Sequence, residues 1–264
     1  MKILNFLFSR SKQEQDKPIR DKLKTRKDFE RVLAEDLDIM ETTKARMDTA
    51  KNINLYMYRS LSYSYILILQ SKYSVDAKID ELRDIYIKSM HYFLQAFNKR
   101  NPIYADILNY VSLGVLLNIP DNNFRQLIDY VKQMDKQAKP SGWTPDLLLW
   151  FMLNSRLKEQ EKQKYAETLA YPRLYNGLYK VIQAPNTAAA KDALNKYLDR
   201  WYNLNSNAPW YNSHLKDNCY RGYWAWEVAA VAKIMHIDDS DLKNNQYYPY
   251  DMVHWEDNET TAKE

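Results

Sequence analysis

Apolar residues recur every three or four positions along most of the chain, and this spacing predicts helices. The most regular stretch is residues 75–98, and long amphipathic helices are also predicted at residues 22–47 and 52–73. Alternation of apolar and polar residues, which is typical of strands, is nearly absent. The sequence therefore predicts an all-α protein.

Capping residues and prolines mark the starts of further helices. Such starts lie at Asn101-Pro102, at Asp121 and at Thr144-Pro145-Asp146. Three more helices are predicted at about residues 162–170, 172–183 and 187–203. Since no motif recurs at a fixed period, we expect a two-part helical bundle built from antiparallel helix hairpins, not a solenoid.

The segment Lys139-Pro140-Ser141-Gly142 is the clearest interruption of the helical pattern, because it combines proline and glycine with polar neighbours. We place the domain boundary there. The expected organisation is an N-terminal leader at residues 1–18, helical domains at residues 19–139 and 143–255, and an acidic tail at residues 256–264.

Residues 220–251 combine an aromatic helix with an acidic turn. The helix is predicted because five apolar positions share the helical repeat, namely Tyr223, Trp226, Ala230, Ile234 and Ile237. Asp239 is expected to cap the short turn that follows. Glu227 lies among aromatic and apolar residues, so it is expected to form a salt bridge or a bond to a tyrosine hydroxyl. Contact with a partner is the alternative.

The composition suits a helical protein in a reducing compartment. Tyrosine occurs 22 times and tryptophan 7 times against 4 glycines, and 45% of the residues are hydrophobic. A disulfide within the chain is excluded, because Cys219 is its single cysteine. The apolar start MKILNFLF is short for a signal peptide, and no apolar run is long enough to span a membrane. We therefore expect a cytoplasmic protein without membrane contact.

Charge is divided unevenly along the chain. The net charge is +4, but from Ile237 onward two basic residues stand against eight acidic ones, a local charge of −6. Such an asymmetry has three interpretations: nucleic-acid affinity in the basic part, an acidic patch that meets a basic partner, or a solvated basic face with a loose acidic tail. The basic run at residues 17–27 makes a nucleic-acid-associated helical adaptor the alternative function. Direct nucleic-acid binding is not expected, because acidic residues follow on the same helix and no recognition motif accompanies the run.

No set of side chains typical of a catalytic, cofactor or metal site is present in the sequence. The four histidines are isolated, and the glycines are too far apart to form a phosphate-binding loop. We therefore expect no enzyme activity, no cofactor and no metal. An enzyme with a pocket formed between the two predicted domains, around Glu227 and a histidine, is a further alternative.

Two segments resemble the two-domain immunity proteins of bacterial polymorphic toxins called PoNi. The first is IRDKLKT at residues 19–25, and the second is GYWAWEVAAV at residues 222–231, followed by IDDS at 237–240 and YYPYD at 247–251. The resemblance extends from about residue 19 to 255. It implies an all-helical protein that binds a cognate DNase toxin of the PD-(D/E)xK type and prevents self-intoxication. Competition between bacteria by means of a secretion system is the implied setting.

The expected partner surface combines the acidic turn with an aromatic rim. Its members are Asp238, Asp239, Asp241, Asp251, Trp210, Tyr211, Tyr247 and Tyr250. The recognisable motif itself is expected to build the fold, through Gly222, Tyr223, Trp224, Trp226, Glu227, Tyr248 and Pro249. The alternative is that the whole motif is structural and that toxin specificity lies on less patterned helix surfaces.

Overall fold

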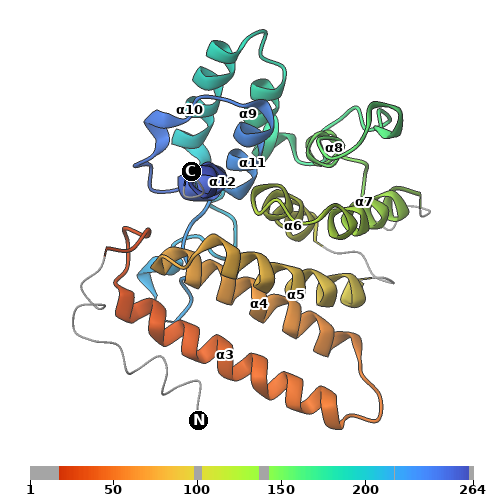
Figure 1. Cartoon of the computed structure of the whole chain (residues 1–264), viewed down its shortest axis with the longest axis vertical. Coiled ribbons are helices and arrows are strands. Elements are labelled where there is room, and N and C mark those ends of the chain that lie inside the picture. The colour runs from red at the N-terminus through yellow and green to blue at the C-terminus, as the bar shows by residue number, and fades with distance from the viewer. Residues whose placement is uncertain (1–17, 98–102, 137–142, 217, 262–264) are drawn as a thin grey trace. The chain divides into compact units, whose positions relative to one another are not determined.

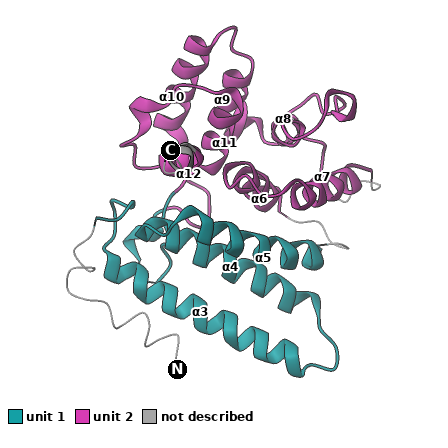
Figure 2. Ribbon diagram, in the orientation of Figure 1, with its two compact units in different colours: residues 1–99, 212–223 teal, residues 100–211, 224–264 magenta. Residues whose placement is uncertain are grey.

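A computed structural model describes residues 18–97, 103–136, 143–216 and 218–261. These residues form ten α-helices, three short 3₁₀ helices and no strand (Figure 1). The predicted all-α class is therefore confirmed. The chain divides into two compact units: unit 1 is residues 1–99 with 212–223, and unit 2 is residues 100–211 with 224–264 (Figure 2). Among the described helices, none has the length and apolar character needed to cross a membrane.

Unit 1 is built on three helices that lie side by side (Figure 1). They are α3 (Arg26–Thr49), α4 (Leu55–Val75) and α5 (Ile79–Phe97), and α4 packs against both others. Thr25 begins α3 with a capping box: its side chain accepts from the Asp28 amide, and the Asp28 side chain accepts from the Thr25 amide. A core between α3 and α4 contains Leu33, Met40, Leu61, Tyr65 and Ile68.

A segment from the second half of the chain completes unit 1. Within residues 212–223, Arg221 donates from Nε and Nη2 to the Asp36 carboxylate, at 2.6 and 2.8 Å. The Tyr220 hydroxyl donates to Asp21, and the Ser74 hydroxyl donates to the Arg221 carbonyl oxygen at 2.9 Å. Asp36 is only 2% exposed, so the bidentate pair lies in the interior. The contacts of Arg221 with α3 and α4 join residues 185 and 147 positions apart in sequence.

Unit 2 surrounds one central helix, α11 (Trp226–Met235). This helix packs against α6, α8, α9, α10 and α12. Its small residues Val228, Ala229, Ala230 and Val231 are fully buried, and small side chains let neighbouring helices approach closely. The other helices of unit 2 are α6 (Tyr104–Leu116), α7 (Asp121–Lys136), α8 (Leu147–Asn154), α9 (Pro172–Ile182), α10 (Thr187–Leu204) and α12 (Tyr250–Thr261).

Close packing also joins α9 and α10. A Cβ atom on Gly177 of α9 would lie 2.5 Å from the ring of Tyr197 on α10, so only glycine fits this position without displacing the ring. The Tyr197 hydroxyl donates to the Leu174 carbonyl oxygen at 3.0 Å, which fixes the same pair of helices. The predicted hairpin of two helices is therefore present here.

The prediction of a helix at residues 162–170 is wrong. This segment follows the short 3₁₀ helix η1 (Glu159–Glu161) and has no regular secondary structure, and several of its polar backbone atoms bond to α8 or to its cap Asp146. Leu147 donates its amide to the Thr168 carbonyl oxygen at 3.0 Å. The side chain of Asn154 donates to the Gln163 carbonyl oxygen and accepts from the Gln163 amide. Backbone atoms used in this way are not available for a local helix.

Several helix ends differ from the expected ones. Within the predicted helix start Thr144-Pro145-Asp146, the cap of α8 is Asp146, which accepts from the Leu149 amide. Tyr223 precedes α11 instead of belonging to it, and α12 continues through the expected acidic tail to Thr261. The predicted leader, the helix start at Asn101-Pro102 and the interruption at residues 139–142 lie outside the described residues. The domain boundary there stays a prediction.

Candidate partner-binding surface

Three of the four aromatic residues of the predicted rim come together at the end of α10. The ring of Tyr202 stacks on Tyr211 at 4.5 Å and on Tyr247 at 5.3 Å, and the ring of Trp201 stacks on Trp210 at 5.4 Å. We call these five residues the aromatic cluster. Trp201 is buried and the other four are partly exposed. Trp201 and Tyr202 were not predicted as members of this surface. Both are aromatic residues of the helix predicted at residues 187–203, shortly before Trp210, and this position could have indicated them.

Tyr250 does not join the aromatic cluster. It begins α12, where its ring lies 4.4 Å from that of His254 and 6.0 Å from the Lys243 ammonium. Asp251, the next residue, is exposed in the first turn of α12. Its carboxylate lies at the N-terminal end of α12, where the helix dipole stabilises a negative charge.

Lys191 of α10 holds the acidic turn. Its ammonium lies 2.8 Å from Asp238 and 3.2 Å from Asp241, and Asn195 donates to Asp241 at 3.0 Å. The hydrogen bond from Lys191 lowers the pKa of Asp238 below its usual value. Both carboxylates are exposed, but a cation of the same chain offsets part of their charge. The negative field of this turn is therefore weaker than the residue count alone suggests.

Asp239 points into the protein instead. It is 2% exposed, accepts from the Tyr248 hydroxyl at 2.6 Å and lies 2.7 Å from Nε2 of His254. The expected capping role is wrong, because Asp239 occupies the cap position of η3 (Ser240–Leu242) without a side-chain cap bond. Asp238 accepts from the Ser240 amide in its place. Asp239 thus fixes the acidic turn to α12, and its side chain is too buried to contact a partner.

The residues expected to build the fold are largely interior. Tyr223, Trp224, Trp226, Tyr248 and Pro249 are buried. The Tyr223 hydroxyl accepts from the His214 amide at 3.0 Å. Gly222 has φ 106°, a left-handed conformation that side chains strongly disfavour.

Glu227 lies in the first turn of α11 and is partly exposed. Its carboxylate accepts from the indole N–H of Trp201 at 2.6 Å, so the partner is a tryptophan and not the expected tyrosine or cation. Burial raises the pKa of Glu227 to about 7. Tyr175 of α9 and Tyr197 of α10 lie close enough that the charge of Glu227 adds to burial in raising their pKa values.

Replacing Glu227 by glutamine is expected to change how stability depends on pH. The pKa rises from 4.5 to about 7 on folding, so the folded protein binds a proton more tightly. The resulting stability is present at pH 4.5 and is lost as pH rises through 7. The E227Q variant should therefore match the wild type near pH 4.5 and exceed it by about 2–3 kcal/mol at pH 8. Thermal unfolding across this range measures the difference, and the exposed Glu167→Gln should show no such trend.

The basic run at residues 17–27 is partly engaged inside unit 1. Arg20 donates from Nη1 to the carbonyl oxygens of Tyr73 and Ala77, and Arg26 donates from Nη2 to that of Val75. These oxygens lie at the C-terminal end of α4, where the helix dipole favours cations. Two of the six basic residues therefore stabilise a helix end, which leaves fewer for phosphate contacts.

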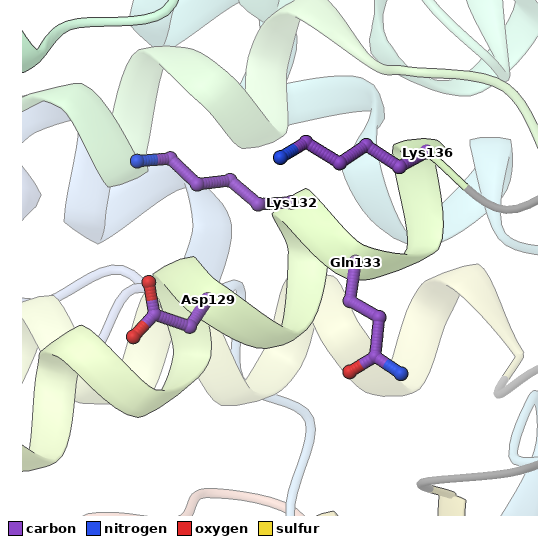
Figure 3. Close-up of a pocket in the computed structure, with 4 residues that line it drawn as sticks. All are labelled: Asp129, Lys132, Gln133 and Lys136. Carbon is purple, nitrogen blue, oxygen red and sulfur yellow. The ribbon is translucent and has the colours of Figure 1, made fainter.

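Two hollows of the surface in unit 2 bear on the enzyme alternative. One, of about 480 Å³, is lined by Asp129, Lys132, Gln133 and Lys136 of α7 (Figure 3). In the other, of about 380 Å³, Arg156 bonds Asp121 and Arg125 bonds Glu161, so the charged groups pair with each other. Neither lining contains histidine or cysteine. Among the described residues, no three His, Cys, Asp or Glu side chains are grouped as metal ligands.

Comparisons with known proteins converge on one family. Models of the PoNe immunity proteins (PoNi) match the chain twice: the N-terminal model matches residues 11–129 and the C-terminal model residues 144–252. The crystal structure of protein PA2201 from Pseudomonas aeruginosa is similar, with a TM-score of 0.68 over 91% of each chain. The two sequences are 18% identical, so this likeness establishes a shared fold. No curated protein matches the chain.

Proposed function

The chain belongs to the PoNe immunity proteins, and from this membership we propose that it binds and neutralises a cognate PD-(D/E)xK-type DNase toxin. The consecutive matches of both family models, over most of the chain, are the observation that carries this proposal. The protein acts in the cytoplasm of the producing bacterium and protects it from its own toxin. It needs no chemistry of its own, because a stable complex that covers or distorts the nuclease site is sufficient.

The proposed contact surface is one side of α10 with the chain that packs on it. Lys191, Asn195 and Tyr202 are 4 and then 7 residues apart, which places them on the same face of a helix. Lys191 and Asn195 hold the acidic turn, and Tyr202 holds Tyr247. The acidic turn and the aromatic cluster therefore follow one another along α10. This continuity supports a single surface that contains both.

The chemistry of this surface suits a nuclease. Tryptophan and tyrosine side chains supply much of the binding energy in protein complexes. A DNase binds phosphates through a cationic surface, and exposed carboxylates such as Asp238, Asp241 and Asp251 complement it. Complementarity depends on the facing surfaces, so the net charge of +4 on the whole chain does not oppose it.

Co-expression with the product of the neighbouring gene tests the function. Toxicity of that product should be suppressed, and the two proteins should purify together. The double variant Asp238→Lys, Asp241→Lys should weaken the complex at least tenfold in a titration, because two attractive contacts become repulsive. Asp129→Lys, an exposed acidic residue on α7, is the matched control and should bind normally.

Two outcomes would separate the parts of this proposal. Absence of both rescue and co-purification would contradict the function. Full affinity of the folded double variant would keep the function and move the contact surface away from the acidic turn. Circular dichroism and thermal unfolding show whether the variant is folded.

A further inference from the structure

The carboxyl group of Glu227 has no cationic partner among the described residues. One of its oxygens accepts from Trp201, and within the described residues no lysine, arginine or histidine lies within ion-pair distance of it. The titratable groups that its charge influences are Tyr104 of α6, Tyr175 of α9 and Tyr197 of α10. Burial raises the pKa of all three tyrosines, so each is neutral at physiological pH. No cation faces Glu227 from these helices.

The contact with Trp201 does not by itself require a carboxylate. A glutamine at the same position would accept the indole N–H with its amide oxygen and would avoid the burial of a charge. Burial raises the pKa of Glu227 to about 7, so this residue lowers stability at neutral pH. A residue that costs stability in this way is typical of a functional site. Glu227 as a whole residue keeps partial exposure to solvent.

The surroundings of Glu227 favour a planar cation. Trp201 links Glu227 to the aromatic cluster, whose Trp210 ring stacks on Trp201 at 5.4 Å and is partly exposed. A guanidinium stacks on tryptophan and tyrosine rings and donates several hydrogen bonds to a carboxylate at once. A lysine ammonium lacks the planar surface for stacking. A DNase supplies arginines of this kind where it contacts phosphates.

We therefore propose that Glu227 accepts an arginine side chain of the nuclease, held against the exposed rings of the aromatic cluster. This inference rests on the function proposed above and assigns Glu227 to the binding surface. The toxin arginine loses a phosphate contact when it pairs with Glu227, so the same contact both binds the toxin and competes with DNA.

The test is a calorimetric titration of the full-length protein with the purified, catalytically inactive toxin between pH 6 and pH 8. Affinity of the wild type should rise about tenfold over this interval, because the ionised fraction of Glu227 rises from about one tenth to about nine tenths. E227Q should bind at least tenfold more weakly than the wild type at pH 8 and should lose the pH dependence. The matched control Glu167→Gln, an exposed glutamate of the same unit, should keep both the affinity and the pH dependence.

Unfolding does not explain the expected loss, because E227Q should be the more stable protein at pH 8. Wild-type affinity and unchanged pH dependence in E227Q would overturn this site while leaving the proposed function in place. Failure of the wild type to bind the toxin at any pH would overturn the proposed function and the site with it. Trp210→Ala provides a second check, since loss of the stacking surface should weaken binding by a similar factor.

Discussion

Replacing Arg221 by alanine should lower the free energy of unfolding by about 3–5 kcal/mol, because it leaves the Asp36 carboxylate buried without its partner. The pair is bidentate, with N–O distances of 2.6 and 2.8 Å, and Asp36 is 2% exposed. Burial already raises the pKa of Asp36 even with the guanidinium beside it. Urea unfolding followed by circular dichroism measures the change.

Two controls make this prediction specific to the buried pair. Arg125→Ala removes a surface ion pair with Glu161 and should cost less than about 1 kcal/mol. The double variant Asp36→Leu, Arg221→Met removes both buried charges and should recover much of the stability that Arg221→Ala loses. A loss in Arg221→Ala no larger than that in Arg125→Ala would show that the buried pair contributes little.

Replacing Asp146 by alanine should cost a similar amount, about 3–5 kcal/mol, because two buried donors and one partly buried donor lose their acceptor. Asp146 is fully buried, and it accepts from the Tyr104 hydroxyl and from the amides of Leu149 and Ala170, at 2.7–2.8 Å. Chemical unfolding measures the loss. The segment at residues 162–170 should also be cleaved sooner in limited proteolysis, since Ala170 is released from α8.

The control for Asp146 is Asn186→Ala. Asn186 caps α10 in the same way, through the Ala189 amide at 2.9 Å, but it is exposed and bonds no other helix there. Its loss should cost about 1 kcal/mol. Equal losses in the two variants would mean that Asp146 acts only as a helix cap and does not join α6, α8 and the segment at residues 162–170.

Local patterns predicted most helices of this protein, because the spacing of apolar residues is a property of each segment by itself. The C-terminal ends of α5 and α10 each lie one residue from their predicted positions, whereas α5 begins four residues later than predicted. The irregular structure of residues 162–170 was not predicted, because Asp146 and Asn154, which bond to its backbone, lie elsewhere in the chain. The same reason hides the bond between Asp36 and Arg221, which joins residues 185 positions apart.

The candidate surface was predictable in part for similar reasons. Aromatic density singled out Trp210, Tyr211 and Tyr247, and these residues do meet around α10. Their convergence on Tyr202 depends on where the chain returns after the acidic turn, which no local pattern specifies. Asp239 is buried because it contacts Tyr248 and His254, which follow it in the sequence. The sequence around Asp238 and Asp239 therefore did not indicate that one is exposed and the other buried.

The return of residues 212–223 to unit 1 has a consequence for protein synthesis. The ribosome produces α3 and Asp36 early, but Arg221 emerges only after α6 to α10 have been made. During that interval Asp36 of the nascent chain lacks the Arg221 guanidinium that pairs with it in the folded protein. A gene fragment ending near residue 139 would hold the chain permanently at this stage. Unit 1 is therefore completed only after most of the chain has been synthesised.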